Sequence, residues 1–336
     1  MYNDDDKYIE PWVSYTREAE RCDYNKKTGP LKMTFHEATN ITFTSPYGED
    51  YSLLMLSKNG GEWVSATNYS GTSLSVASGD TLEFRGDYDT YNPFGWHGGS
   101  QEDYQERVAM NTQYIDVLDD SHWPKVALEG NIMSLIDSEN YSNIESFTEP
   151  HVFELLGLFR KISITDMSKL VLPVTGLTDY CYSGLFYRAE ELHQSGAYHI
   201  FSFDEFATAP ALPATTLAEG CYKEMFKNCW SLEIAPVLSA QTLVGDCYYA
   251  MFASCLNLHD VTILATSLDS SLSSVRECCM DMLAAGNADC AGLAYVDKHG
   301  GQCTFNCPNQ TILADFSANY DSIGCTFDSR IWNIPE

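Results

Sequence analysis

Basic side chains are scarce in this sequence. Nineteen lysines and arginines stand against 47 aspartates and glutamates in 336 residues, which gives a formal net charge of −28. A protein that binds nucleic acid needs a basic surface to neutralise phosphates. An anionic bilayer or a strongly acidic polysaccharide would repel such a chain as well. We therefore expect no nucleic-acid partner, whereas neutral glycans, basic protein surfaces and divalent cations stay open.

Long apolar runs are also missing. No stretch reaches the length of about 18 apolar residues that a membrane-spanning helix needs. The chain opens Met-Tyr-Asn-Asp-Asp-Asp, which is acidic where a signal peptide is basic, and no apolar segment follows. We expect no membrane insertion. Because no leader is recognisable, we also expect that the chain is kept in a cytoplasm, is assembled there into a particle, or has had its leader removed. Hydrophobic residues still make up 44% of the chain, which favours a packed core.

The sequence signatures of catalysis are lacking. There is no His-Glu-x-x-His, no Gly-x-Ser-x-Gly and no phosphate-binding loop, and the eight histidines are scattered. The acidic pairs and runs, such as Asp119-Asp120, do not have the spacing of a calcium-binding EF-hand loop. We expect a protein that is not an enzyme and that holds no cofactor and no metal.

What the chain has instead is an internal repeat. The segment 209–232 matches the segment 235–258, and every landmark residue shifts by 26 positions, as from Cys221 to Cys247. An earlier copy has its cysteine at Cys181, which is 40 residues before Cys221, or one period plus 14 residues. This spacing predicts an insert at about residues 190–206. Weaker copies at both ends are typical of caps.

Within one copy the apolar side chains recur at i, i+4, i+5, i+8 and i+9, which indicates one face of an α-helix. The Leu-Pro pair that precedes them suits a helix entry. We predict a unit of short strand, turn and short helix that buries its apolar face only when stacked on its neighbours. The predicted repeat core comprises Leu217, Cys221, Met225, Phe226, Leu243, Cys247, Met251 and Phe252.

The twelve cysteines fit this repeat better than they fit a metal site. Cys221 and Cys229 lie 8 positions apart, whereas zinc ligands favour pairs separated by two to four residues. A buried free cysteine acts as a small apolar side chain, and we favour this role. Cys303 and Cys307, with His299 nearby, leave half a zinc site or a local disulfide as alternatives.

The pattern Leu-Pro-Ala-Thr-Thr-Leu-Ala, followed by Cys-Tyr, Met-Phe and Cys-x-Ser-Leu, resembles the BspA-type leucine-rich repeats. The resemblance covers roughly residues 127–325 and is most specific over 170–258. Such repeats occur in surface proteins of gut Bacteroidetes and in the phages that infect them, and they are generally adhesive or protein-binding. The resemblance implies a leucine-rich-repeat solenoid with a binding role.

The amino-terminal third has a different pattern. Residues 31–86 alternate between apolar and polar side chains in short runs, and turn signals recur every ten or so residues. Asn59-Gly60 is a hairpin signal, because these residues supply the positive φ angles of a tight turn. We predict a small antiparallel β-sandwich here.

The sequence therefore predicts a multidomain α+β fold, a β-sandwich followed by a short BspA-type leucine-rich-repeat solenoid of strand-turn-helix units. Residues 1–30 form an arm or hairpin, 31–86 the sandwich, and 87–125 a connector rich in Tyr, Asp and Gly. Residues 126–336 form the repeat domain, with its insert and a degraded carboxy-terminal cap.

Loops inserted in a repeat array commonly carry binding, so the insert and the connector supply the candidate recognition surface. The alternatives are an insert that folds back on the repeats or mediates oligomer contact, and connector aromatics that pack the joint between domains. The candidate recognition residues are Tyr187, His193, Tyr198, His199, Phe201, Phe203, Tyr91 and Trp96, and those of a docking arm are Tyr8, Trp12 and Tyr15.

Our first functional hypothesis is a bacteriophage virion component: a fibre, a decoration protein or a tail-associated attachment protein. Its partners would be other virion proteins, or a protein or glycan on the host surface, and it would work as a homo- or hetero-oligomer. The alternatives are a bacterial cell-surface adhesin and a glycan-active enzyme that uses the connector.

Overall fold

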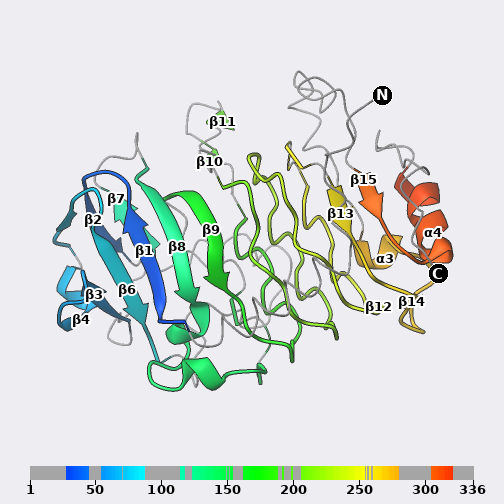
Figure 1. Ribbon diagram of the computed structural model, residues 1–336, viewed down its shortest axis with the longest axis horizontal. Helices are drawn as coiled ribbons and strands as arrows, with labels where there is room; N and C mark the ends of the chain where they lie inside the picture. Colours follow the sequence, from blue (N-terminus) through cyan, green and yellow to red (C-terminus); the bar gives the residue numbers. More distant parts are fainter. Residues whose placement is uncertain are drawn as a thin grey trace, which may run out of the picture.

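The computed structural model describes residues 28–44, 54–69, 71–87, 114–117, 123–148, 150, 152–153, 162–187, 191–192, 198–199, 206–253, 255, 257–258, 260–279 and 304–320. Within these ranges the fold is mixed α+β, mostly sheet with few helices (Figure 1). In the same ranges, no helix is long and apolar enough to cross a membrane.

Two sheets occupy the amino-terminal part of the fold. The six-stranded sheet has the order β4-β3-β6-β1-β8-β9, and the three-stranded sheet has the order β5-β2-β7. Their strands are β1 (Leu31–Phe35), β2 (Thr39–Thr44), β3 (Met55–Lys58), β4 (Trp63–Ser65), β5 (Leu74–Val76), β6 (Thr81–Arg85), β7 (Tyr114–Val117), β8 (Lys125–Asn131) and β9 (Ser163–Val171). The short 3-10 helices are η2 (Ala66–Tyr69), η3 (Ile132–Leu135) and η4 (Tyr141–Asn143).

The alternating pattern of the sequence accounts for these strands. Leu31, Met33 and Phe35 of β1 are fully buried, and the residues between them face outward. Phe43 of β2 meets Phe84 of β6 edge-on, with ring centroids 6.4 Å apart, so the two sheets share a core. Asn59 and Gly60 have φ angles of 53° and 66°, and β3 pairs antiparallel with β4, which confirms the predicted hairpin.

The six-stranded sheet is mixed, because β8 and β9 pair in parallel. Among the strands within residues 31–86 the described pairings are all antiparallel, and the parallel edge is formed by β8 and β9 outside that range, between which the chain must cross over. β8 begins at Lys125, the last residue of the predicted connector, and β9 lies beyond it; the domain limits themselves stay predictions.

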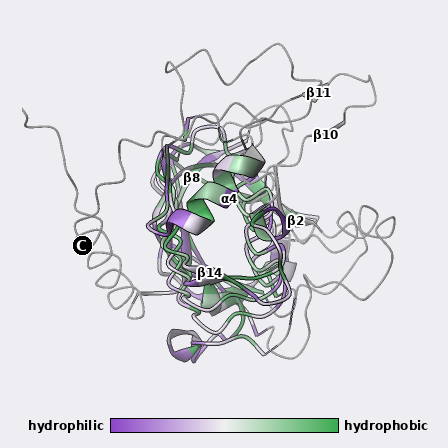
Figure 2. Ribbon diagram, turned by 90° about the vertical axis from the view of Figure 1, so that its right-hand side faces the viewer, coloured by the Kyte–Doolittle hydropathy of each residue, from purple (hydrophilic) through white to green (hydrophobic). Residues whose placement is uncertain are grey.

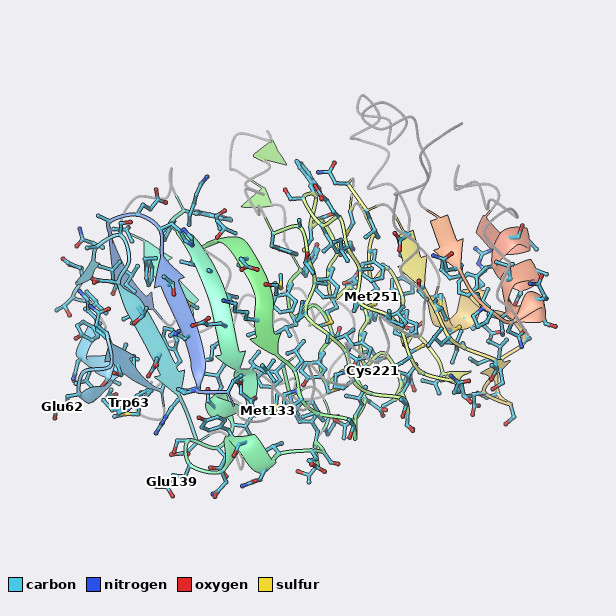
Figure 3. All side chains as sticks on the ribbon, in the orientation of Figure 1. Glu62, Trp63, Met133, Glu139, Cys221 and Met251 are labelled. Atoms are coloured by element: carbon cyan, nitrogen blue, oxygen red, sulfur yellow. The ribbon has the colours of Figure 1, made fainter. Side chains whose placement is uncertain are left out.

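A buried joint ties the start of β1 to the ends of β6 and β8. The hydroxyl of Ser134, in η3, accepts a hydrogen bond from the Leu31 amide at 3.0 Å and donates to the Phe84 carbonyl at 2.8 Å. The neighbouring Met133 is fully buried and lies at the lower end of the sheet in Figure 3. This serine satisfies two backbone groups that would otherwise be buried without a partner.

After β9 the copies of the repeat lie side by side in register. Parallel bridges join Thr208 to Ile234 and Ile234 to Asp260, so each of these two steps is one 26-residue period, whereas the step from Gly176 to Thr216 across the insert is 40 residues. The short parallel pairs continue this arrangement: β12 (Thr242–Leu243) with β14 (Ser267–Leu268), and β13 (Asp260–Thr262) with β15 (Thr304–Asn306). In Figure 1 the copies follow β9 along the long axis of the molecule.

The segment predicted as the helix of each copy is instead a run of hydrogen-bonded turns. The amides of Tyr222, Glu224 and Phe226 donate to carbonyls of the next copy, at 2.8 to 3.1 Å. The intervening amides, such as those of Lys223 and Met225, donate to the third residue before them. Because half of the amides bond to the neighbouring copy, the ladder of an α-helix does not form, and the helix prediction is wrong.

A left-handed residue at every fourth position makes this run possible. Gly220, Glu224 and Asn228 have φ angles of 57°, 55° and 65°, and Asp246 and Ala250 repeat the pattern in the next copy. Over residues 221–228 burial follows the same period of four, with two buried residues followed by two partly exposed ones. The spacing i, i+4, i+5 therefore marked the inward face of a turn run.

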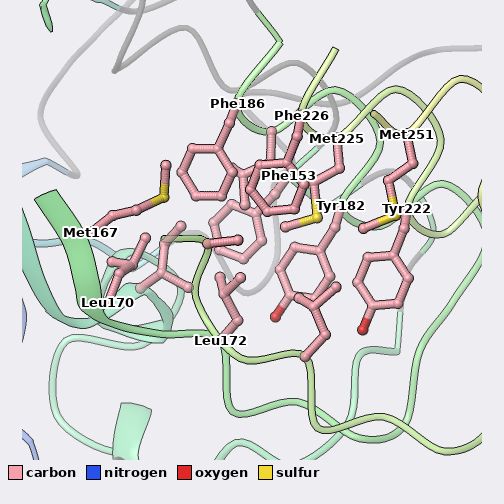
Figure 4. Close-up of a cluster of buried hydrophobic side chains, with 14 of the residues drawn as sticks. Phe153, Met167, Leu170, Leu172, Tyr182, Phe186, Tyr222, Met225, Phe226 and Met251 are labelled. Carbon is pink, nitrogen blue, oxygen red and sulfur yellow. The ribbon is translucent and has the colours of Figure 1, made fainter. Parts of the chain in front are cut away.

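Two aromatic ladders run through the stack (Figure 4). In the first, the rings of Phe186, Phe226 and Phe252 stack with centroids 5.4 and 5.7 Å apart. In the second, the tyrosine ladder, the rings of Tyr182, Tyr222 and Tyr248 stack with centroids 5.9 and 6.1 Å apart. Such contacts add to the apolar area that each copy buries. Cys221 and Met251, labelled in Figure 3, lie in the same interior.

Helix α4 (Gln310–Tyr320) covers the carboxy-terminal end of the stack, as the end-on view in Figure 2 shows. Phe316 and Ile312 are buried, and the Phe316 ring lies 4.3 Å from that of Phe305. The Asp315 carboxylate accepts the Val275 amide at 2.7 Å, just before the short helix α3 (Arg276–Cys279). The last copy therefore does not present its apolar edge to water.

Candidate recognition surface

The predicted insert leaves the stack at one corner. In the copy that follows the insert, four residues, 228–231, connect Lys227 to Leu232; in the interrupted copy, residues 188–205 make the same connection from Tyr187 to Phe206. The residues on both sides of the insert stay in register with the next copy. The Phe186 amide donates to the Met225 carbonyl at 2.9 Å, and the Ala209 amide donates to the Ile234 carbonyl at 3.0 Å. The stack thus continues on either side of the insertion point.

Within the insert, β10 (Glu191–Leu192) and β11 (Tyr198–His199) pair antiparallel. Figures 1 and 2 both show this pair standing outside the body of stacked copies. Two of the predicted recognition residues, Tyr198 and His199, are therefore on a strand that projects from the stack.

Tyr187 is the predicted residue nearest to the base of the insert, and it is half-buried. The Lys227 ammonium of the next copy lies 5.2 Å from the centroid of its ring and 2.7 Å from a carboxylate oxygen of Glu224. Burial lowers the pKa of Lys227, but the hydrogen bond and charge of Glu224 outweigh this effect and raise it. The ammonium therefore stays charged.

A second lysine links three copies, and the sequence pattern did not reveal it. The Lys223 ammonium lies 4.6 Å from the Tyr249 ring centroid and 5.8 Å from that of Tyr180. It also pairs with the Asp246 carboxylate at 3.0 Å. The only signal in the sequence is the four-residue spacing of Lys223 and Lys227, which matches the period of the turn run.

Residues 230–234, in the copy that follows the insert, form a partly exposed corner of the stack near the insert. Ile234, which forms an isolated parallel bridge with Thr208 just after the insert, has 56% of its surface exposed. Glu233 beside it is exposed and Trp230 is half-buried. A single exposed apolar side chain is ordinary on a protein surface and does not by itself mark a contact site.

The other predicted recognition residues lie outside the described residues. These are His193, Phe201, Phe203, Tyr91 and Trp96, together with the arm residues Tyr8, Trp12 and Tyr15. The predicted repeat core is described in full, and its members are all buried: Leu217, Cys221, Met225, Phe226, Leu243, Cys247, Met251 and Phe252.

The cysteines of the described copies are buried free thiols. Cys229 donates to the Phe186 carbonyl at 3.4 Å and Cys255 to the Phe226 carbonyl at 3.1 Å, so each thiol satisfies a backbone oxygen of the preceding copy. Burial raises the pKa of Cys181 to about 12, which keeps that thiol protonated and unreactive. No group of three His, Cys, Asp or Glu side chains in the described ranges is placed to hold a metal ion. Cys303 and His299 lie outside these ranges.

Comparison of the chain with protein-family models, with curated proteins and with solved structures finds no match.

Proposed function

We propose that this protein is a recognition module in which a BspA-type leucine-rich-repeat solenoid holds the β10–β11 hairpin out toward a partner. The observation that carries the proposal is the position of that hairpin, outside a stack whose copies stay in register on both sides of it. A repeat array in which neighbouring copies bond to each other is a stiff support, and loops inserted in such arrays commonly carry binding.

The setting that we propose is a bacteriophage virion, where the chain acts as a fibre, decoration or tail-associated attachment protein. The repeat type that the sequence resembles occurs in phages of gut Bacteroidetes. A net charge of −28 favours a partner that is neutral or basic, such as a neutral surface glycan or a basic protein face. The amino-terminal arm, residues 1–30, would dock the protein onto other virion proteins.

Mass spectrometry of purified infectious particles tests the virion setting. The proposal predicts that peptides of this chain are still found, at a constant number of copies per particle, after the particles are purified on a density gradient. If the chain is absent from the particles but present on the surface of uninfected cells, the setting is wrong and the protein is a bacterial adhesin.

Size-exclusion chromatography with light scattering tests the role of the arm. The full chain should form an oligomer, or co-elute with a virion partner, and a version without residues 1–30 should not. If the truncated chain assembles like the full chain, the arm does not mediate assembly and this part of the proposal is wrong.

A further inference from the structure

Arg85, the last residue of β6, is a cation without an anion. Among the described residues, its buried Nε has no hydrogen-bond partner and no carboxylate forms an ion pair with it. Two other cations of the same sheet do have such partners, because Lys32 pairs with Glu129 and Lys58 with Asp80. An arginine cannot lose its proton, so its buried N–H favours an acceptor that a binding partner supplies.

The side chain of Arg85 carries this charge to the edge of the sheet. The strand order is β4-β3-β6, so β6 is the third strand from that edge. The Arg85 guanidinium carbon nevertheless lies 4.5 Å from the centroid of the Trp63 ring, and Trp63 belongs to the edge strand β4. Arg85 points outward, because its neighbour Phe84 is buried in the core. A strand placed about 4.8 Å beyond β4 would therefore bring its own side chains close to the guanidinium.

The edge strand β4 is open on its outer side. Among the described residues β4 pairs only with β3, and Figure 3 shows Trp63 at the end of the fold away from the stacked copies. An edge strand offers its outer backbone N–H and C=O groups to another strand. Met55, which lies opposite Arg85 on β3, is half-buried, as are Trp63 and Arg85. Trp, Arg and Met are the residue types enriched where proteins bind one another.

We propose that the β4 edge binds an extended peptide segment of a protein partner, and that a carboxylate of this segment pairs with Arg85 beside Trp63. The backbone of the segment would continue the sheet, and one Asp or Glu on its outward face would accept hydrogen bonds from the guanidinium. Glu83, two residues before Arg85 on β6, faces the same side and favours a single carboxylate over an acidic run. This site does not depend on the β10–β11 hairpin or on the proposed recognition role.

A display library of short random peptides, panned against the full chain, tests this site. We expect a family of enriched peptides with Asp or Glu at one constant position. Binding of this family to Arg85→Gln should be about tenfold weaker or less, because the charged, two-pronged hydrogen bonds are lost. Lys169→Gln, an exposed position on the strand β9 at the other end of the sheet, is the matched control and should bind the family unchanged. Thermal unfolding curves show whether both variants are folded.

Methylation of the peptide backbone tests the strand addition and needs no variant of the protein. Only alternate amides of an added strand face β4, so N-methyl groups at every second residue should abolish binding and those between should be tolerated. The inference is wrong if no enriched family depends on Arg85, or if that family has no constant acidic position. It is equally wrong if N-methylation has the same effect at every residue.

Discussion

At the scale of single residues, the stack repeats its chemistry as well as its shape. Two successive copies each place a thiol against a backbone carbonyl of the preceding copy, as Cys229 does for Phe186 and Cys255 for Phe226. Lysines on the outer side of the turn run lie against tyrosine rings and carboxylates that belong partly to other copies. Side chains thus connect the copies both inside and outside the stack.

The Lys223 cluster gives a first prediction at this scale. Lys223→Met keeps the apolar stem but removes the charge that lies between Tyr180, Tyr249 and Asp246. We expect a loss of about 0.5–1 kcal/mol in the free energy of unfolding, because the cluster is partly exposed and screened by solvent. Urea titrations in low and high salt measure it, and the loss should shrink in high salt.

Lys227→Met is the comparison, because Lys227 contacts Glu224 in its own copy and the Tyr187 ring in one other copy, whereas Lys223 contacts side chains of two other copies. Its effect should be the smaller of the two. No loss in Lys223→Met would show that the link across three copies does not stabilise the stack.

Asp80 gives a prediction of pH dependence. A hydrogen bond from the Ala77 amide, and then those from Lys58 and Asn59, hold the pKa of Asp80 well below its usual value. A carboxylate with a lowered folded-state pKa stabilises the fold above its unfolded pKa of about 4, and this contribution is lost as the pH falls toward the folded value. Asp80→Asn should therefore lower the urea midpoint near neutral pH.

The Asp80→Asn and wild-type midpoints should then converge as the pH is lowered below about 4. Urea titrations at neutral and acidic pH measure both effects. A difference between the two proteins that is the same at every pH would mean that ionisation of Asp80 contributes nothing to the turn.

At the scale of elements, the turn run decides how the copies fit together, and Gly220 tests it. Its φ is +57°, and a Cβ there would lie 2.4 Å from the Tyr180 ring of the preceding copy. Gly220→Ala should cost about 2 kcal/mol or more, since both backbone strain and a clash follow. Gly245→Ala is the matched control, because its Cβ would meet nothing closer than Glu219 Cγ at 3.9 Å.

Thermal or urea unfolding of the two variants measures the difference. Gly245→Ala should be close to neutral. A Gly220→Ala protein as stable as its control would contradict the left-handed backbone at this position.

The elements also show how far the sequence predicts this structure. The 26-residue period, the buried positions and the location of the insert follow from spacing alone, because stacked copies must repeat their landmarks. The turn run could not be foreseen, since a four-residue period of turns buries the same i, i+4, i+5 positions as a helix. The left-handed conformations of Glu224 and Ala250 leave no trace in residue type.

The candidate surface was predictable in part for the same reason. An interruption of a repeat marks an insert, and the hairpin with Tyr198 and His199 lies there. The cluster around Lys223 escaped prediction because its members come from three copies. Their proximity depends on how the copies pair, which the sequence of one copy does not contain.

At the scale of the whole molecule, a stack of copies needs closed ends, and α4 closes one of them. Phe316→Ala removes a buried ring that packs on Phe305 and should cost about 3 kcal/mol. Copies interact with their nearest neighbours, so the loss should appear first in the last copy. Hydrogen exchange should therefore speed up more in residues 260–279 than in residues 206–230.

A uniform increase in exchange along the stack and the six-stranded sheet would contradict this local effect. It would indicate that the whole chain unfolds as one cooperative unit.

The central claim, that the stack supports the insert and the insert recognises the partner, is tested most directly by replacing residues 188–205 with the four residues found at 228–231, Asn-Cys-Trp-Ser. The measurement is binding of the labelled protein to a panel of gut Bacteroidetes cells, beside a thermal unfolding curve. The account predicts a folded variant that no longer binds cells bound by the full chain. A folded variant that binds as well as the full chain, or a full chain that binds no cells, would contradict it.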